Sequence, residues 1–318
     1  MNKIFNVNNV SPDGRVDFTF IGQNIQDTTE VKIIDENTGL TVYRANLPLI
    51  TGASWFVTTG ENNARKLKNG IFSLKYGDEI VEEKIKFEGQ NRYLVVDSKQ
   101  IKLSYIGDDL FPIVCEIFYD KIYERDFVRP SIGDVIVDIG ANYGVFSLYS
   151  QMFNPKKVYA VEPVKDTFEN MKNNLEVYGV VCINKAISDE NGYETFAVTE
   201  VNGNNFSFKN KDGYHPSNII NEEVVESITI NQLIKDYNIE KIDYLKVDCE
   251  GGEKHLFEQI DKEYLKNNIN KIAIEYHSQD IFNILMDILT QNNFIIEDTS
   301  GSTEIGLIYA YNKKFLKN

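Results

Sequence analysis

The segment VIVDIGANYGVFS, at residues 135–147, limits the folds that are open to this chain. Its apolar first half is typical of a buried strand. That half ends near Asp138 and leads into a turn that contains Gly140 and Gly144. The apolar residues after the turn predict a helix whose N-terminal N–H groups point back at the turn. Because small residues let a ligand approach the backbone closely, the segment predicts an α/β domain with a binding turn for a nucleotide-like ligand.

The details of the turn favour one class of ligand. A dinucleotide-binding turn has the pattern Gly-x-Gly-x-x-Gly, which lets an anionic pyrophosphate lie at the helix N-terminus. The turn here reads DIGANYG from Asp138 to Gly144 and lacks that pattern. A carboxylate at the end of the strand repels a pyrophosphate but attracts an ammonium group or the cationic sulfonium of S-adenosylmethionine. The turn therefore favours a methyl donor, and a tight turn without a ligand stays open as an alternative.

A second acid follows the next predicted strand. KVYAV, at residues 157–161, ends directly before Glu162, which lies 24 residues after Asp138. In nucleotide-binding βαβ units, an acid roughly 20 residues after the first turn binds a ribose hydroxyl. Glu162 is therefore a candidate for holding ribose. The alternative is an acid that is stabilised only by the dipole of the following helix.

Charge and composition exclude several classes of partner. The formal net charge of the 318 residues is −15 at pH 7, which argues against nucleic acid as a partner. The sequence has no apolar run long enough to span a bilayer, and its N-terminus has no signal-like apolar region. Its three cysteines are too scattered for a disulfide framework. These features predict a cytoplasmic protein without a membrane span.

The chain is expected to hold two domains. Residues 1–95 have strand and turn patterns without helical periodicity, and these patterns predict hairpins at 31–45 and 70–87. They predict a small, all-β, sandwich-like accessory domain. Residues 96–318 alternate strand and helix patterns, which predicts an α/β fold with a doubly wound, seven-stranded, mostly parallel sheet.

The second domain is predicted in more detail from its apolar periodicity. We expect further strands at 157–161, 180–183, 244–247 and 271–276, and helices at 109–126 and 165–178. A strongly amphipathic helix that carries the apolar residues of 281–289 should follow the strand at 271–276, and 294–297 with 305–311 should form a closing antiparallel hairpin. The polar segment 199–218 is long for a connection within a compact domain. Such a segment is either a cover over the ligand crevice or a solvated excursion.

A third signature, YLKVDCEGGEKHLF at residues 244–257, has a strand that ends in Asp248 and Glu250. With this motif the chain resembles the FkbM-type methyltransferases, which use S-adenosylmethionine on a class I methyltransferase fold. VDIGANYGVFS resembles the first motif of the family, VYAVEP the second, INKAISDENGYETF the segment after the third strand, KVDCEGGE the Lys-x-Asp-x-Glu-Gly-x-Glu signature, and IEYH the end of the fifth strand. The resemblance covers roughly residues 111–313.

The resemblance implies roles for residues of the donor site. The turn would line the methionine part of S-adenosylmethionine, through Asp138, Gly140, Ala141, Asn142 and Gly144. Glu162 would hold the ribose hydroxyls, and Ala186 with Ile187 would flank the adenine.

The acceptor side is expected at the ends of the fourth and fifth strands, where ligands of open α/β sheets meet. Asp248 or Glu250 would interact with the acceptor, with His277 as a candidate general base. A divalent metal held by the carboxylates is a rival to this interpretation, although we do not favour it. Glu253 opens a predicted helix, where the helix dipole alone would favour an acid.

Three hypotheses for function follow. The leading one is an S-adenosylmethionine-dependent O-methyltransferase that acts on a hydroxyl of a glycan or glycosylated metabolite; the family and the β-rich first part together suggest the saccharide. The second is an NAD-dependent oxidoreductase on a Rossmann-like fold. The third is a non-catalytic glycan-binding or assembly protein that retains the donor pocket. A homo-oligomer is compatible with all three.

Overall fold

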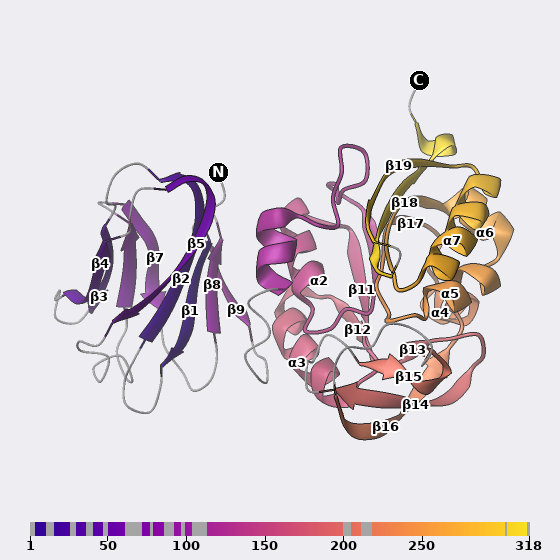
Figure 1. Cartoon of the computed structure of the whole chain (residues 1–318), viewed down its shortest axis with the longest axis horizontal. Coiled ribbons are helices and arrows are strands. Elements are labelled where there is room, and N and C mark those ends of the chain that lie inside the picture. Colours follow the sequence, from indigo (N-terminus) through magenta and orange to yellow (C-terminus); the bar gives the residue numbers. More distant parts are fainter. Residues whose placement is uncertain are drawn as a thin grey trace. The chain divides into compact units, whose positions relative to one another are not determined.

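A computed structural model describes residues 113–199, 205–210, 218–302 and 304–316, and the backbone of nine strands before them. The chain forms two compact units, Met1–Tyr105 and Ile106–Asn318. Each unit is described by itself below (Figure 1).

The first unit contains two antiparallel sheets. One has the order β5-β2-β1-β8-β9 and the other β4-β3-β6-β7. Their bounds are β1 Ile4–Val10, β2 Val16–Ile25, β3 Glu30–Asp35, β4 Thr41–Asn46, β5 Ile50–Gly60, β6 Phe72–Tyr76, β7 Glu79–Ile85, β8 Arg92–Val96 and β9 Lys99–Leu103. The two predicted hairpins are present, because β3 pairs with β4 and β6 pairs with β7. The sandwich arrangement of this unit stays a prediction.

The second unit is built on a seven-stranded sheet with the order β12-β11-β10-β17-β18-β20-β19. Its strands are β10 Val135–Ile139, β11 Lys157–Val161, β12 Val181–Ile183, β17 Ile242–Val247, β18 Ile269–Tyr276, β19 Phe294–Gly301 and β20 Gly306–Asn312. β10, β11, β12, β17 and β18 pair in parallel, whereas β20 pairs antiparallel with both β18 and β19. The predicted α/β class, the mostly parallel sheet and the closing hairpin are confirmed.

Helices cover both faces of this sheet, as Figure 1 shows, with α2 and α3 on one side and α4 to α7 on the other. Their bounds are α2 Val145–Ser150, α3 Lys165–Leu175, α4 Ile230–Asp236, α5 Glu253–Gln259, α6 Lys262–Asn268 and α7 Gln279–Gln291. The starts of several helices follow from side-chain caps, since Thr229, Asp261 and Ser278 each accept a hydrogen bond from a first-turn N–H. The arrangement is doubly wound, as predicted.

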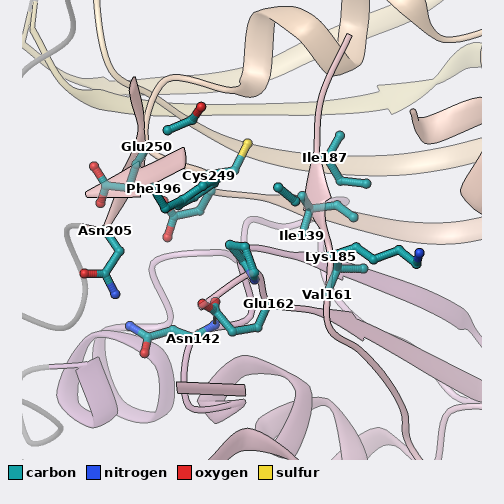
Figure 2. Close-up of a pocket in the computed structure, with 15 residues that line it drawn as sticks. Ile139, Asn142, Val161, Glu162, Lys185, Ile187, Phe196, Asn205, Cys249 and Glu250 are labelled. Carbon is teal, nitrogen blue, oxygen red and sulfur yellow. Dashed lines mark hydrogen bonds between the residues drawn. The ribbon is translucent and has the colours of Figure 1, made fainter. Parts of the chain in front are cut away.

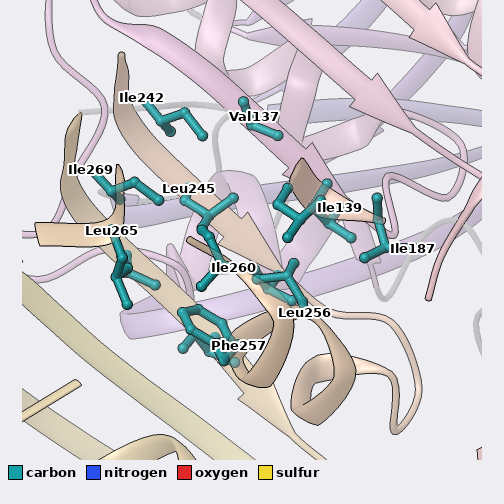
Figure 3. Close-up of a cluster of buried hydrophobic side chains, with 14 of the residues drawn as sticks. Val137, Ile139, Ile187, Ile242, Leu245, Leu256, Phe257, Ile260, Leu265 and Ile269 are labelled. Carbon is teal, nitrogen blue, oxygen red and sulfur yellow. The ribbon is translucent and has the colours of Figure 1, made fainter. Parts of the chain in front are cut away.

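The core between the sheet and α4 to α7 fixes the strand ends that form the site (Figure 3). Val137 and Leu245 on adjacent strands, and Leu256 and Phe257 on α5, are all completely buried. Each such side chain contributes roughly 1.5–3 kcal/mol when it leaves water. The apolar runs of β10 and β17 therefore hold the loops that follow them in a fixed relation.

A smaller sheet, which the sequence did not predict, lies beyond the end of β12. Its order is β13-β16-β14-β15, with bounds β13 Ala186–Ile187, β14 Gly192–Thr199, β15 Phe206–Ser207 and β16 Ile219–Ile228. Of the two alternatives for 199–218, the solvated excursion is wrong for the described part, because β15 pairs with β14 and Asn205 and Ser207 line the pocket. The short helix η5 (Phe208–Asn210) follows β15, and 200–204 and 211–217 lie outside the described residues.

The helix predicted at 109–126 is shorter than expected. In the described residues it comprises 113–120, including η2 (Cys115–Asp120), and Lys121 then has a left-handed backbone with φ 54°. The apolar spacing after Asp120 instead packs irregular backbone against the sheet, where Tyr123 and Val128 are buried. Among the residues that the structure describes, no helix has the length and apolar character needed to cross a membrane.

Candidate active site

A pocket lies at the carboxyl ends of β10, β11 and β17 (Figure 2). It encloses about 620 Å³ of space between atoms, part of it open to solvent. Figure 2 shows Asn142 and Glu162 together at one end and Glu250 at the other. The lining residues are Ile139, Gly140, Asn142, Val161, Glu162, Pro163, Lys185, Ala186, Ile187, Phe196, Asn205, Ser207, Asp248, Cys249 and Glu250.

Gly140 fixes the turn after β10 against the neighbouring strands. Its φ is +69°, and a Cβ placed on it would lie 1.6 Å from the carbonyl oxygen of Asp248. The N–H groups of Gly140 and Ala141 donate to the carbonyl oxygen of Val161, at 3.1 and 2.9 Å. A residue with a side chain cannot occupy this position without moving the end of β17.

Gly144 and Ala141 do not line the pocket but shape the turn beside it. Gly144 precedes α2 with φ +81°, and a Cβ there would lie 2.7 Å from Cδ1 of Leu175 on α3. The N–H of Gly144 donates to the carbonyl oxygen of Ala141 at 2.8 Å. These two residues were predicted to line the S-adenosylmethionine site. They instead close the turn and let α2 and α3 approach each other.

Asn142 presents an unused acceptor at the pocket. Its backbone is left-handed, with φ 51°, and its N–H donates to Oε2 of Glu162 at 3.0 Å. Its side-chain Oδ1 is buried and has no hydrogen-bond partner among the described residues. Because buried polar atoms nearly always have partners, this oxygen fits a donor group of a ligand.

Glu162 lies beside Asn142 and is 6% exposed. Its Oε1 accepts the N–H of Val164 at 3.1 Å, so each carboxylate oxygen holds one backbone N–H. Burial raises the pKa of Glu162 to about 7, and the two backbone hydrogen bonds offset part of that rise. Each oxygen retains a lone pair that can accept a further hydrogen bond.

Asp138 does not line the pocket. It is completely buried in β10, where it accepts a hydrogen bond from Oγ of Ser147 at 2.7 Å. The ammonium of Lys246 lies 3.3 Å from its other oxygen. Burial raises the pKa of Asp138, while Lys246 and Ser147 oppose that rise. The structure therefore places this acid beneath the turn, and its contact with a donor stays a prediction.

Lys246 links the two halves of the site, and the sequence reasoning missed it. Its Nζ donates to the carbonyl oxygen of Gly140 at 2.7 Å and lies 3.5 Å from Oδ2 of Asp248. Burial lowers the pKa of Lys246, but the neighbouring acids Asp138 and Asp248 outweigh this and raise it overall. A lysine inside the apolar run of β17 was the available signal, because a buried lysine needs anionic partners.

The wall formed by the smaller sheet combines apolar and polar groups. Ala186 and Ile187, predicted to flank adenine, are buried here, and Ala186 packs in one apolar cluster with Phe196. Asn205 and Ser207 complete this wall. The sequence reasoning missed Phe196, Asn205 and Ser207; for Asn205 and Ser207 the signal was the length of the polar segment 199–218.

Asp248, Glu250 and His277 meet at the other end of the site. Nε2 of His277 lies 3.4 Å from Oε2 of Glu250, and Oδ2 of Asp248 accepts a hydrogen bond from the hydroxyl of Tyr123 at 2.9 Å. One ligand-type atom from each of the three residues lies within 4.8 Å of the others. Asp248 and Glu250 line the pocket, and His277 lies behind Glu250.

Glu253 holds this end together. It opens α5 as predicted and is completely buried, and its contacts go beyond the helix dipole that was expected to favour an acid here. Its Oε1 accepts the N–H groups of Cys249 and Gly251, at 3.0 and 3.2 Å, and lies 3.1 Å from Nδ1 of His277. The carboxylate therefore fixes both the loop after β17 and the imidazole ring.

Both ring nitrogens of His277 face carboxylates. Burial lowers the pKa of His277, but Glu253, Glu250 and Asp248 outweigh it and raise that pKa well above the usual value. An imidazole that already carries two protons cannot accept a third. His277 can therefore act as a general base only after it has lost a proton.

Tyr123 and Glu275 extend the acidic end and were also missed. The Tyr123 hydroxyl lies 3.1 Å from Oε2 of Glu275, so its single proton is shared between Glu275 and Asp248. Burial and the charge of Asp248 raise the pKa of Glu275 to about 7. The IEYH motif contains Glu275, but only the fold brings Tyr123 to it.

Comparisons with known proteins place the site within a matched region. Residues 138–296 match the family described as the methyltransferase FkbM domain. The chain is 29% identical over 181 residues to Methyltransferase 1 of Beauveria bassiana, covering 50% of this chain and 70% of that protein. It is 29% identical over 136 residues to the 31-O-demethyl-FK506 methyltransferase FkbM of Streptomyces tacrolimicus, covering 41% of this chain and 48% of that protein.

Two further similarities have lower sequence identity. AMB antimetabolite synthetase AmbE of Pseudomonas aeruginosa is 26% identical over 199 residues, which cover 52% of this chain and 9% of that protein. A crystal structure of a methyltransferase FkbM from Methylobacillus flagellatus superposes with a TM-score of 0.43 at 17% identity, covering 61% of this chain and 48% of that chain. The chain thus spans only part of several of the proteins that it resembles.

Proposed function

This chain belongs to the methyltransferase FkbM domain family, and we propose that it transfers the methyl group of S-adenosylmethionine to a hydroxyl oxygen of a saccharide or glycosylated small molecule. The observation that carries the proposal is the pairing of two groups at one end of the pocket: the unpartnered Oδ1 of Asn142 and the buried carboxylate of Glu162. A third group, Asp248, lines the opposite end.

The chemistry of the pocket fits the donor. S-adenosylmethionine carries ribose hydroxyls and an ammonium group, which can donate hydrogen bonds to the unpartnered Oδ1 of Asn142 and to the remaining lone pairs of Glu162. Ala186 and Ile187 offer apolar surface for a flat base such as adenine. We assign ribose to Glu162, the base to the wall of Ala186 and Ile187, and the methionine part to the turn at Gly140.

When bound, the donor supplies an electrophilic methyl group on a sulfonium. In the reaction, the acceptor oxygen forms a bond to the methyl carbon while the carbon–sulfur bond breaks, and the electron pair of that bond stays on sulfur as a neutral thioether. The hydroxyl proton leaves to a nearby base. The chain's contribution is largely alignment of oxygen, carbon and sulfur in line.

The acceptor side is assigned to Asp248, Glu250 and His277. The carboxylates of Asp248 and Glu250 line the pocket, so they can accept a hydrogen bond from an acceptor hydroxyl and orient its oxygen. Because both ring nitrogens of His277 face carboxylates, we assign the first proton transfer to Asp248 or Glu250. His277 then balances the negative charge of the two carboxylates.

The name of a relative supports the proposal that the methyl group is transferred to oxygen. The name of the Streptomyces tacrolimicus protein describes methylation of 31-O-demethyl-FK506. The saccharide is inferred from the family resemblance and from the β-rich unit Met1–Tyr105.

Calorimetry tests the donor assignment. We expect the protein to bind S-adenosylmethionine with 1:1 stoichiometry and to show no heat with NAD⁺. Glu162→Ala should weaken donor binding at least about tenfold, because it removes both lone pairs assigned to ribose. The matched control is Glu169→Gln, which changes an exposed acid on α3. Binding of NAD⁺ without a response to S-adenosylmethionine would overturn the proposal.

A further inference from the structure

The side chains of Asp248, Glu250 and His277 are of the types that bind metal ions, besides being able to form hydrogen bonds to an acceptor. It combines two carboxylates and one imidazole, from the loop after β17 and the residue after β18. Their ligand-type atoms lie within 4.8 Å of one another. Ligands about 2.1 Å from one ion lie up to about 4.2 Å apart, so small side-chain rotations would bring all three onto one ion.

Glu250 is a carboxylate without a hydrogen bond. Its side chain is 16% exposed, and no described residue donates a hydrogen bond to either of its oxygens. Its backbone is left-handed, with φ 51°, a conformation that costs energy for a residue with a side chain. The loop therefore holds a largely buried carboxyl group in a strained position, 3.4 Å from Nε2 of His277. In its ionised form, such a group needs a cation beside it.

His277 is oriented as metal-binding histidines commonly are. The ring is 2% exposed, and Nδ1 lies 3.1 Å from the Glu253 carboxylate, which two backbone N–H groups hold in place. Nε2 makes no hydrogen bond within the described part of the chain and faces Glu250. The Glu253 carboxylate keeps the Nδ1 proton of His277 in place, so an ion that displaces the proton from Nε2 would find that nitrogen able to act as a ligand.

The surrounding charges favour a cation as well. Besides the three residues of the cluster, Glu275 reaches Asp248 through the hydroxyl of Tyr123. The one lysine that reaches this group in the described residues is Lys246, which is shared with Asp138. The carboxylates thus outnumber the permanent cations.

We propose that Asp248, Glu250 and His277 bind one divalent metal ion at the acceptor end of the pocket, with Glu253 positioning the imidazole. One nitrogen and two oxygen ligands suit an ion such as Mn²⁺ or Zn²⁺. The ligand set leaves coordination positions for a substrate oxygen. In the proposed methyl transfer, on which this role rests, the ion would lower the pKa of the acceptor hydroxyl and hold its oxygen.

Metal binding can be measured without any methyl transfer. The full-length protein, freed of metals by a chelator, is titrated with Mn²⁺ and followed by calorimetry and by the electron paramagnetic resonance signal of free Mn²⁺. We expect one site per chain. Asp248→Asn, Glu250→Gln and His277→Ala should each weaken Mn²⁺ binding at least about tenfold, and Glu253→Gln by about 10- to 100-fold.

Two variants serve as matched controls. His255→Ala removes a histidine of the same helix as Glu253, and Glu258→Gln removes an exposed acid of that helix. Both should bind Mn²⁺ as the unaltered protein does. Circular dichroism and thermal unfolding select the variants that are folded, and Asp248→Asn and Glu250→Gln preserve side-chain volume.

The proposal is overturned if the unaltered protein binds none of Mn²⁺, Zn²⁺ and Mg²⁺, or if the folded Asp248 and Glu250 variants bind Mn²⁺ unchanged. A titration with S-adenosylhomocysteine in the presence of chelator reports on the donor pocket alone. Donor binding without metal binding would remove the metal site and leave the proposed function standing. Metal binding without donor binding would do the reverse.

Discussion

At the scale of single residues, Gly140 is the position where the backbone tolerates least change. Gly140→Ala would place a methyl group 1.6 Å from the carbonyl oxygen of Asp248. We expect a loss of more than about 2 kcal/mol in the free energy of unfolding, since the left-handed backbone alone costs about 1–2 kcal/mol. Denaturant unfolding measures this loss.

The control for Gly140 is Gly133→Ala. Gly133 has a similar φ, +80°, but a Cβ there would meet no atom within 4 Å. Gly133→Ala should therefore lower the free energy of unfolding by only about 1–2 kcal/mol. Equal losses in the two variants would show that the contact with Asp248 does not limit this turn.

The raised pKa of Glu162 should make the stability of the protein depend on pH. This pKa is raised to about 7 in the folded protein, above the usual value of 4.5 for a glutamate side chain, so the folded state binds its proton more tightly than the unfolded state. The contribution of Glu162 to stability is therefore fully present below pH 4.5 and is lost as pH rises toward 7. Glu162→Gln should remove this loss, which unfolding measured at pH 5 and pH 8 would reveal.

Donor affinity should change in the opposite direction. A ribose hydroxyl donates most strongly to an ionised carboxylate, so the affinity for S-adenosylmethionine should fall as pH decreases below about 7, by up to about tenfold per pH unit. Calorimetry on Glu162→Gln separates this effect from titration of the donor's own amino group. An identical pH profile in the variant would contradict the assignment of ribose to Glu162.

Residues on the strand-to-helix turns could be selected from the sequence, since Asn142 and Glu162 follow buried strands at an informative spacing. The buried contacts of Lys246 and Glu253 could not be predicted from the sequence. Both lie within motifs that were recognised, but whether an acid in a helix's first turn faces water or a histidine depends on how α5 meets β18.

At the scale of elements, the smaller sheet depends on Glu194 of β14. This acid is 7% exposed and accepts hydrogen bonds from the hydroxyls of Ser188 and Ser207, the latter at 2.7 Å. The ammonium of Lys209 lies 3.2 Å from it. Glu194 therefore ties the end of β13 to β15 and η5, which together carry one wall of the pocket.

Glu194→Ala should loosen that wall. We expect a loss of about 1–3 kcal/mol in the free energy of unfolding, because two hydroxyls and an ammonium lose a charged partner. The dissociation constant for S-adenosylmethionine should rise at least about threefold, with calorimetry as the measurement. The matched control, Glu190→Ala, removes an exposed carboxylate that also binds Lys209. Unchanged donor affinity in Glu194→Ala would contradict this role.

Elements with strong periodicity could be predicted from the sequence, and others could not. The apolar runs of the main sheet and the amphipathic α7 follow from local pattern. β13 and β15 each span two residues, too short for any periodic signal. They exist because β14 and β16 offer edges for pairing, which is a property of the tertiary fold.

At the scale of the whole molecule, the pocket-lining residues all belong to the unit Ile106–Asn318. We expect a fragment of residues 106–318 to unfold cooperatively and to bind S-adenosylmethionine with the affinity of the full chain, within about threefold. Thermal unfolding and calorimetry on the fragment test this. A folded fragment that fails to bind the donor would mean that residues 1–105 contribute to the site.

The central claim is that the pocket at the ends of β10, β11 and β17 holds a methyl donor with its sulfur facing the acidic end. A crystal structure with S-adenosylhomocysteine tests it most directly. We predict ribose hydroxyls on the Glu162 carboxylate, the base against Ala186 and Ile187, and the sulfur directed toward Asp248 and Glu250. A ligand bound elsewhere, or one whose sulfur points away from Asp248 and Glu250, would contradict the claim.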